Sequence, residues 1–147
     1  ILKISVLKEH EEAIFSHLAV LTEDTEPIQM YVQDNDTPDI PGADLYRTNC
    51  ASCHLPGGDG IPNFTPPLLG TATVSDKSKL IETTLFGLSG EIEVKGKQYN
   101  EIMPGFGVSL TDQEVKELLN FVRTGLNDHA DSITVAEIEE IRKRQTL

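Results

Sequence analysis

The sequence predicts an all-α domain with one small β-hairpin, preceded by an N-terminal extension whose fold no pattern indicates. Three observations lead to this prediction. Apolar residues recur at helical spacing in several segments after residue 41. Two of those segments begin with a capping box, the side-chain pattern that starts many helices. The stretch Cys50-Ala51-Ser52-Cys53-His54 also holds both cysteines of the chain and ends in a histidine.

Residues 1–40 differ from the rest of the chain in charge. They hold nine acidic and two basic residues, a net of −7, whereas residues 41–147 hold fifteen acidic and ten basic residues, a net of −5. Apolar residues alternate over 2–6 as in a short strand, and those of 13–21 recur at helical spacing. The polar stretch 33–42 is interrupted by prolines and predicts a boundary. We therefore expect an acidic extension or docking arm over 1–40 and one domain over 41–147.

Helices are expected at the start of the domain. The spacing predicts a helix from Gly42 to Cys53, and a loop rich in Gly and Pro follows it to Gly70. Ser75 is the expected N-cap of the next helix, which Gly87 would end.

A hairpin should follow that helix. Ile92 and Val94 alternate with charged residues, and Lys95-Gly96 would turn the chain towards Lys97 and Tyr99.

The last two helices carry their own start signals. Thr111–Glu114 is a capping box for a helix that should reach Gly125. Thr134–Glu137 repeats the pattern for a short final helix within 133–144, whose basic end suits the helix dipole.

The spacing of Cys50, Cys53 and His54 is that of the covalent attachment site of a c-type haem. Each thiol can form a thioether with one vinyl group of the porphyrin, and the imidazole of His54 can then bind the iron. A disulfide, half of a zinc site and a thioredoxin-like redox pair are the alternatives. A structural zinc site needs four N/S ligands, and no βαβ pattern surrounds Cys50. The motif therefore favours one covalent haem c over these alternatives.

A second axial ligand would come from a methionine, and the chain has Met30 and Met103. Pro104 favours extended geometry in Met103, and the glycines that follow let a loop lie against a flat porphyrin. A thioether ligand raises the reduction potential. Met103 is the expected ligand of the iron, although packing in the core is the commoner role of a methionine.

With these motifs in place, residues 42–127 resemble a class I (mitochondrial-type) bacterial cytochrome c domain. Gly42, Leu45 and Tyr46 ahead of the haem motif match the N-terminal helix of that family, and the segments 110–114 and 121–123 match its C-terminal helix. The resemblance implies the cytochrome c fold, in which helices pack around one haem. It also implies that these two helices cross, with Gly42 close to Phe121.

The resemblance implies further site residues. Pro66-Pro67-Leu68 is similar to a loop whose proline carbonyl accepts a hydrogen bond from the axial histidine, and either Pro66 or Pro67 could supply it. Tyr99 and Asn100 are similar to residues before the methionine loop, where they would bond a haem propionate or serve only the hairpin. Members of this subgroup occur free, and also fused to or associated with nitrite reductases, dehydrogenases and terminal oxidases.

Ligation by His54 and Met103 would leave the iron no open position, which implies single-electron transfer rather than catalysis. The alternative is a peroxidase-like or sensory haem from which Met103 dissociates, but no distal histidine or arginine is placed to assist such chemistry. We expect a redox protein as partner, and the acidic surface either complements a basic docking face on that partner or serves only solubility. The net charge of −12 argues against nucleic acid. The bases that would flank the haem or simply face solvent are Lys77, Lys79, Lys95 and Lys97.

The expected location follows from the covalent haem, whose attachment normally follows export. No run of ~18 apolar residues predicts a membrane span, and no signal peptide opens the chain. Since residue 1 is not Met, we expect a mature or trimmed chain at the periplasm or the outer face of the cytoplasmic membrane, where a lipid anchor is possible. It would act there as a free carrier, as a subunit or as a domain of a redox complex.

Overall fold

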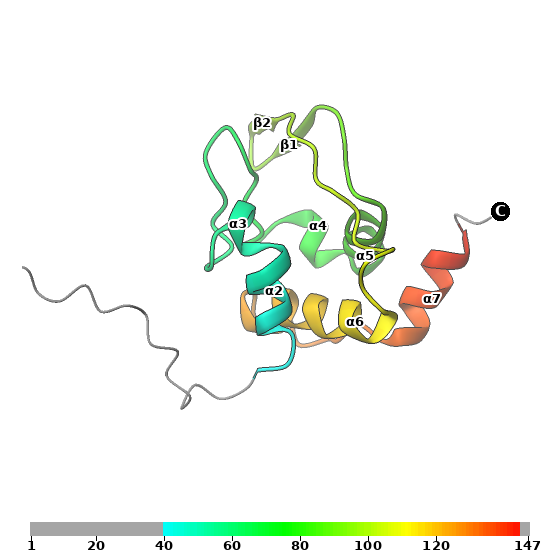
Figure 1. Cartoon of the computed structure of the whole chain (residues 1–147). Coiled ribbons are helices and arrows are strands. Elements are labelled where there is room, and N and C mark those ends of the chain that lie inside the picture. The colour runs from blue at the N-terminus through cyan, green and yellow to red at the C-terminus, as the bar shows by residue number, and fades with distance from the viewer. Residues whose placement is uncertain (1–39, 145–147) are drawn as a thin grey trace, which may run out of the picture. The chain divides into compact units, whose positions relative to one another are not determined.

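The structure, a computed structural model, describes residues 40–144 and is built from helices and one two-stranded hairpin. The predicted strand over 2–6, the helix over 13–21, the boundary and Met30 lie outside the described residues. Figure 1 shows the elements, which are, in order, α2 (Ala43–Asn49), α3 (Ala51–His54), α4 (Ala72–Ser75), α5 (Lys77–Phe86), β1 (Ile92–Val94), β2 (Lys97–Tyr99), α6 (Asp112–Asn120), the π-helical turn η1 (Phe121–Gly125) and α7 (Val135–Arg144). The predicted helical class is confirmed.

The first predicted helix is two helices, so the expected continuity through Gly42–Cys53 was wrong. α2 ends at Asn49 because Cys50, with φ −122°, leaves the helical region, and α3 starts anew at Ala51. The amides of Cys53 and His54 both donate to the Cys50 carbonyl, at 3.1 and 2.9 Å. This break forms a tight turn at Cys50, the first residue of the haem motif.

The predicted N-cap at Ser75 was also wrong. Thr71 caps α4, Ser75 is the last residue of that helix, and Asp76 caps α5 by accepting a hydrogen bond from the Lys79 amide at 3.1 Å. Gly87 ends α5 as predicted, with its amide bonded to the Thr83 carbonyl at 2.9 Å.

The hairpin and both capping boxes are confirmed. β1 and β2 are antiparallel, with Ile92 opposite Tyr99, and Lys95 and Gly96 form the turn with positive φ angles of 51° and 74°. The Thr111 side chain and Glu114 make the reciprocal bonds of a capping box, and Thr134 and Glu137 repeat them. The helix that begins at Thr111 reaches Gly125, but its last turn is the π-helical η1.

The crossing of α2 with α6 and η1 shapes the core (Figure 1). A Cβ on Gly42 would lie 2.0 Å from the Glu117 carbonyl oxygen, so only glycine allows this approach. Gly42 therefore lies closest to Glu117 rather than to the predicted Phe121. The Phe121 ring instead packs on Tyr46, at a centroid distance of 5.4 Å.

A buried arginine joins η1 to α4. The side chain of Arg123 is 1% exposed and donates to the carbonyls of Val74 and Ser75 at 2.5 and 3.1 Å. It also forms an ion pair with Asp131, 2.5 Å away, which Lys77 contacts at 3.2 Å. Because the last carbonyls of a helix have no partner within the helix, Arg123 supplies the partners that α4 lacks.

Candidate haem site

The two cysteines lie at the junction of α2 and α3, and neither forms a disulfide. Cys50 is half-buried and Cys53 is exposed. Burial, with a smaller contribution from Cys53, raises the pKa of the Cys50 thiol to about 11. The described residues contain no group of three or more His, Cys, Asp or Glu side chains that could hold a metal ion. The disulfide and zinc alternatives therefore find no support in this part of the chain.

His54 is oriented by a single backbone carbonyl. Its Nδ1 lies 3.0 Å from the Pro66 oxygen, and since a carbonyl only accepts, Nδ1 carries the proton and Nε2 keeps a lone pair. The sequence left Pro66 and Pro67 as alternatives, and the structure selects Pro66. Burial lowers the pKa of His54 against the opposing effect of this hydrogen bond. The imidazole is thus held in the neutral form that binds iron.

Tyr46 anchors the chain immediately after His54. Its hydroxyl donates to the Leu55 carbonyl at 2.7 Å, and Leu55 has a positive φ of 63° that a side-chain-bearing residue rarely adopts. The sequence indicated Tyr46 only as a helix residue, because the partner carbonyl lies nine positions away. Burial is the main cause that raises the pKa of Tyr46 to about 12, so this donor stays protonated.

One crevice brings the predicted axial ligands together. Its lining includes Cys50, His54 and Met103, and the empty space, including the opening to solvent, is about 350 Å³. The hydroxyl-bearing Thr84 also lines it. The remaining wall is apolar and comes from the loop before α4, α5, the loop after β2, α6 and η1, through Leu68, Leu80, Phe106, Leu118, Leu119 and Val122.

Met103 is held by its backbone, which leaves its thioether available. Its amide donates to the Leu88 carbonyl and its carbonyl accepts from the Leu88 amide, both at 2.9 Å. A Cβ on Gly87 would lie 2.5 Å from the Met103 carbonyl oxygen. The end of α5 therefore fixes where the methionine enters the crevice.

The other predicted site residues do not line this crevice. Cys53 and Asn100 are exposed, Pro67 is half-buried, and Tyr99 is buried at the end of β2. Contacts of Tyr99 and Asn100 with a propionate stay a prediction. Of the four lysines, Lys77 is engaged with Ser132, Asp131 and Glu137, whereas the other three are exposed.

The side chains present fit a c-type haem. The crevice combines an imidazole with a free Nε2, a thioether and an apolar lining. Cys50 lies in the same lining, and Cys53 follows it one turn later in α3. A helical domain organised around such a crevice defines the class of small haem proteins that carry electrons.

Comparison with known proteins agrees with this class. The family model for cytochrome c matches residues 40–125, and the chain belongs to the cytochrome c family. The predicted cytochrome c fold and its covalent haem c are confirmed.

Several curated proteins are similar to this chain. Cytochrome c-552 of Thermus thermophilus is 36% identical over 114 residues, which cover 71% of this chain and 86% of the relative. The cytochrome c subunit of the quinone alcohol dehydrogenase of Gluconobacter oxydans is 33% identical over 69% of this chain and 22% of the relative. The gluconate 2-dehydrogenase cytochrome c subunit of Pantoea cypripedii is 30% identical over 87% of this chain and 29% of the relative. The chain thus spans less than a third of these two dehydrogenase subunits.

Proposed function

We propose that the chain transfers single electrons through one haem attached to Cys50 and Cys53, whose iron His54 and Met103 would bind. The observation that carries this assignment is the shared crevice, which His54 and Met103 both line. Two such protein ligands would leave no position on the iron for a substrate. The chain is then an electron carrier and not itself an enzyme.

Each residue has a separate task in this proposal. The thioethers of Cys50 and Cys53 would fix the porphyrin edge, and the Pro66 carbonyl orients the imidazole of His54. The thioether of Met103 would favour the reduced state of the iron and raise its reduction potential. The apolar wall would exclude water and lower the local dielectric, and Tyr99 and Asn100 would either bond a propionate or serve only the hairpin. The haem itself supplies the one-electron couple.

Two molecular contexts are consistent with this role. The first context is a separate carrier, for which the relevant relative is cytochrome c-552. The match covers 86% of that protein. The second context is a subunit or domain of a larger redox complex, for which the relevant relatives are the dehydrogenase subunits. The match to the gluconate 2-dehydrogenase subunit covers 87% of the chain, which is more than residues 40–147 contain. It therefore extends into the acidic N-terminal residues and favours the second context.

The expected surroundings follow from cofactor and charge. Because covalent haem attachment normally follows export, we place the chain at the periplasm or the outer face of the cytoplasmic membrane of a bacterium. No helix in residues 40–144 is long and apolar enough to cross a membrane. The net charge of −12 suits a redox partner with a basic docking face, and residues 1–40 are the proposed docking arm.

Covalent attachment is tested by removing both thiols. Mass spectrometry of the denatured wild type should show the chain plus one haem, and the Cys50→Ala/Cys53→Ala double variant should show the bare chain. Met103→Ala is the matched control and should keep its covalent haem, because Met103 binds only the iron. Haem that leaves the denatured wild-type chain would contradict the proposal.

A further inference from the structure

The final helix reaches the segment that carries the methionine, residues 103–110, which we call the Met loop. We propose that Arg142 on α7 is a positioning residue for Met103, because its guanidinium holds the Met loop closed against the crevice. The inference rests on the proposed ligation by His54 and Met103. It assigns to α7 a role in controlling how readily the methionine leaves the iron.

Arg142 binds the Met loop and its continuation at several points. Its Nη1 donates to the Gly107 carbonyl, and its Nη2 lies 3.5 Å from the Leu110 carbonyl. Its Nε donates to Asp112 at the start of α6, at 2.8 Å, and the same carboxylate lies 2.7 Å from Nη2. A guanidinium presents these donors in a rigid planar fork. The contacts therefore fix the carbonyls of the loop relative to α6 and α7 together.

Besides the pairing of Met103 with Leu88, the Met loop is anchored to α5 through two of its backbone amides. The amides of Phe106 and Gly107 donate to the carbonyls of Thr84 and Leu85, each at 2.9 Å. These are carbonyls of the last turn of α5, which need partners from outside the helix. Gly107 is thus held from both directions, through its amide by α5 and through its carbonyl by Arg142.

Polar anchoring matters here because, apart from Met103 and Phe106 in the crevice wall and Leu110 against the core, the side chains of the loop bury little apolar surface. Val108 is fully exposed, and the side chain of Ile102, just before the loop, is 76% exposed. Segments with few buried apolar contacts open at low free-energy cost unless hydrogen bonds retain them. Departure of Met103 from the iron requires the loop to move, so loss of the Arg142 bonds should make this opening more frequent.

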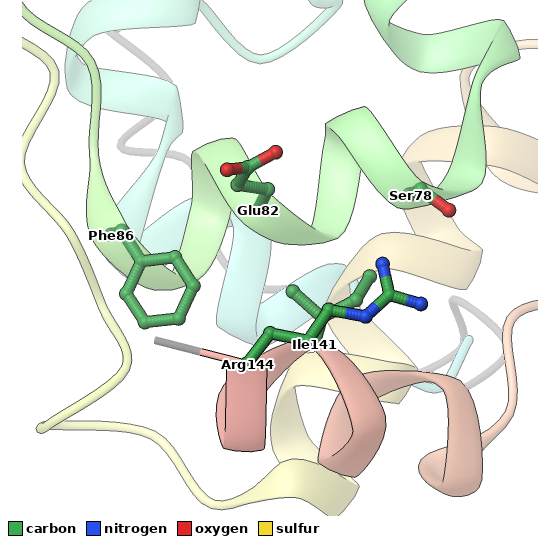
Figure 2. Close-up of a pocket in the computed structure, with 5 residues that line it drawn as sticks. All are labelled: Ser78, Glu82, Phe86, Ile141 and Arg144. Atoms are coloured by element: carbon green, nitrogen blue, oxygen red, sulfur yellow. The ribbon is translucent and has the colours of Figure 1, made fainter. Parts of the chain in front are cut away.

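α7 is itself firmly docked, which makes Arg142 an effective anchor. Ile138 and Ile141 are buried in the core, and Thr134 caps the helix through Glu137. Figure 2 shows α7 beside α5, where Ile141 and Arg144 meet Ser78, Glu82 and Phe86 around a surface pocket. Arg144 bonds Glu140 within α7 at 2.5 Å, so it serves the helix, whereas Arg142 serves the Met loop.

The test is the rate at which added imidazole displaces Met103 in the oxidised holoprotein. Arg142→Ala is expected to raise this rate about tenfold, which corresponds to about 1.4 kcal/mol. Arg142→Lys keeps the charge near Asp112 but lacks the fork, so its rate should fall between wild type and Arg142→Ala. The control is Lys143→Ala, which removes the neighbouring, 78% exposed side chain and should leave the rate unchanged.

Equal imidazole rates in wild type, Arg142→Ala and Lys143→Ala would overturn the inference, even if Arg142→Ala lowers thermal stability. If Arg142→Ala does not fold, the imidazole rate of Arg142→Lys is compared with those of wild type and Lys143→Ala instead, and equal rates would overturn the inference. Failure of the proposed function has a different signature, because the oxidised wild type would then lack the Met–iron charge-transfer band before any imidazole is added.

Discussion

Replacing Met103 by alanine is expected to abolish the Met–iron charge-transfer band of the oxidised protein. The reduction potential should also fall, by on the order of 0.1 V within the roughly 0.8 V range that axial ligation spans. The reason is that a thioether stabilises ferrous iron. Absorption spectra and a potentiometric titration measure the two effects. The Met loop should stay in place, because Met103 pairs with Leu88 through backbone atoms alone.

Met30→Ala is the matched control for this prediction, because it removes the chain's second methionine. Both the band and the potential should be unchanged in that variant. A band that survives in Met103→Ala and disappears in Met30→Ala would assign the ligand to Met30 and refute the site described above.

Replacing Gly42 by alanine is expected to lower the free energy of unfolding by about 3 kcal/mol or more, since overpacking costs about 1–3 kcal/mol and a left-handed backbone roughly 1–2 kcal/mol. Gly42 has φ +89°, and an added Cβ would lie 2.0 Å from the Glu117 carbonyl oxygen. This contact cannot relax without separating α2 from α6. Denaturant unfolding of the holoprotein measures the change.

The hairpin offers a control that isolates the backbone cost. Gly96 has φ +74°, and an added Cβ would meet nothing within 4 Å. Gly96→Ala should therefore cost only about 1–2 kcal/mol, the price of the left-handed conformation. Equal losses in the two variants would show that the close crossing of α2 and α6 contributes little to stability.

Structural features that depend on a few neighbouring residues were predictable from the sequence. Both capping boxes and the Lys95-Gly96 turn involve groups no more than three positions apart, and all three are confirmed. The start of α5 was not predictable in this way. Thr71, Ser75 and Asp76 are all good N-cap residues, and the carbonyls of Val74 and Ser75 are bound by Arg123 from almost fifty positions away. A local pattern does not contain that contact.

The same distinction applies to the site. Cys50, Cys53 and His54 form a contiguous motif, and the sequence Met103-Pro104 marks the methionine. The choice of Pro66 over Pro67 required the position of the imidazole, and the bond from Tyr46 to Leu55 required the turn after α3. The sequence indicated Arg142 only as a favourable charge at the end of a helix. Its contact with Gly107 joins residues 35 positions apart and was not predictable from a local pattern. Contacts of this kind come from tertiary packing.

The most direct test of a closed electron-transfer haem is the addition of carbon monoxide to the reduced protein at neutral pH. If His54 and Met103 occupy both axial positions, the wild-type spectrum should not change rapidly. Met103→Ala has lost one ligand and should bind carbon monoxide at once, which provides the positive control. A rapid and complete spectral change in the wild type would contradict the closed site and point to a haem that binds a substrate or a gas.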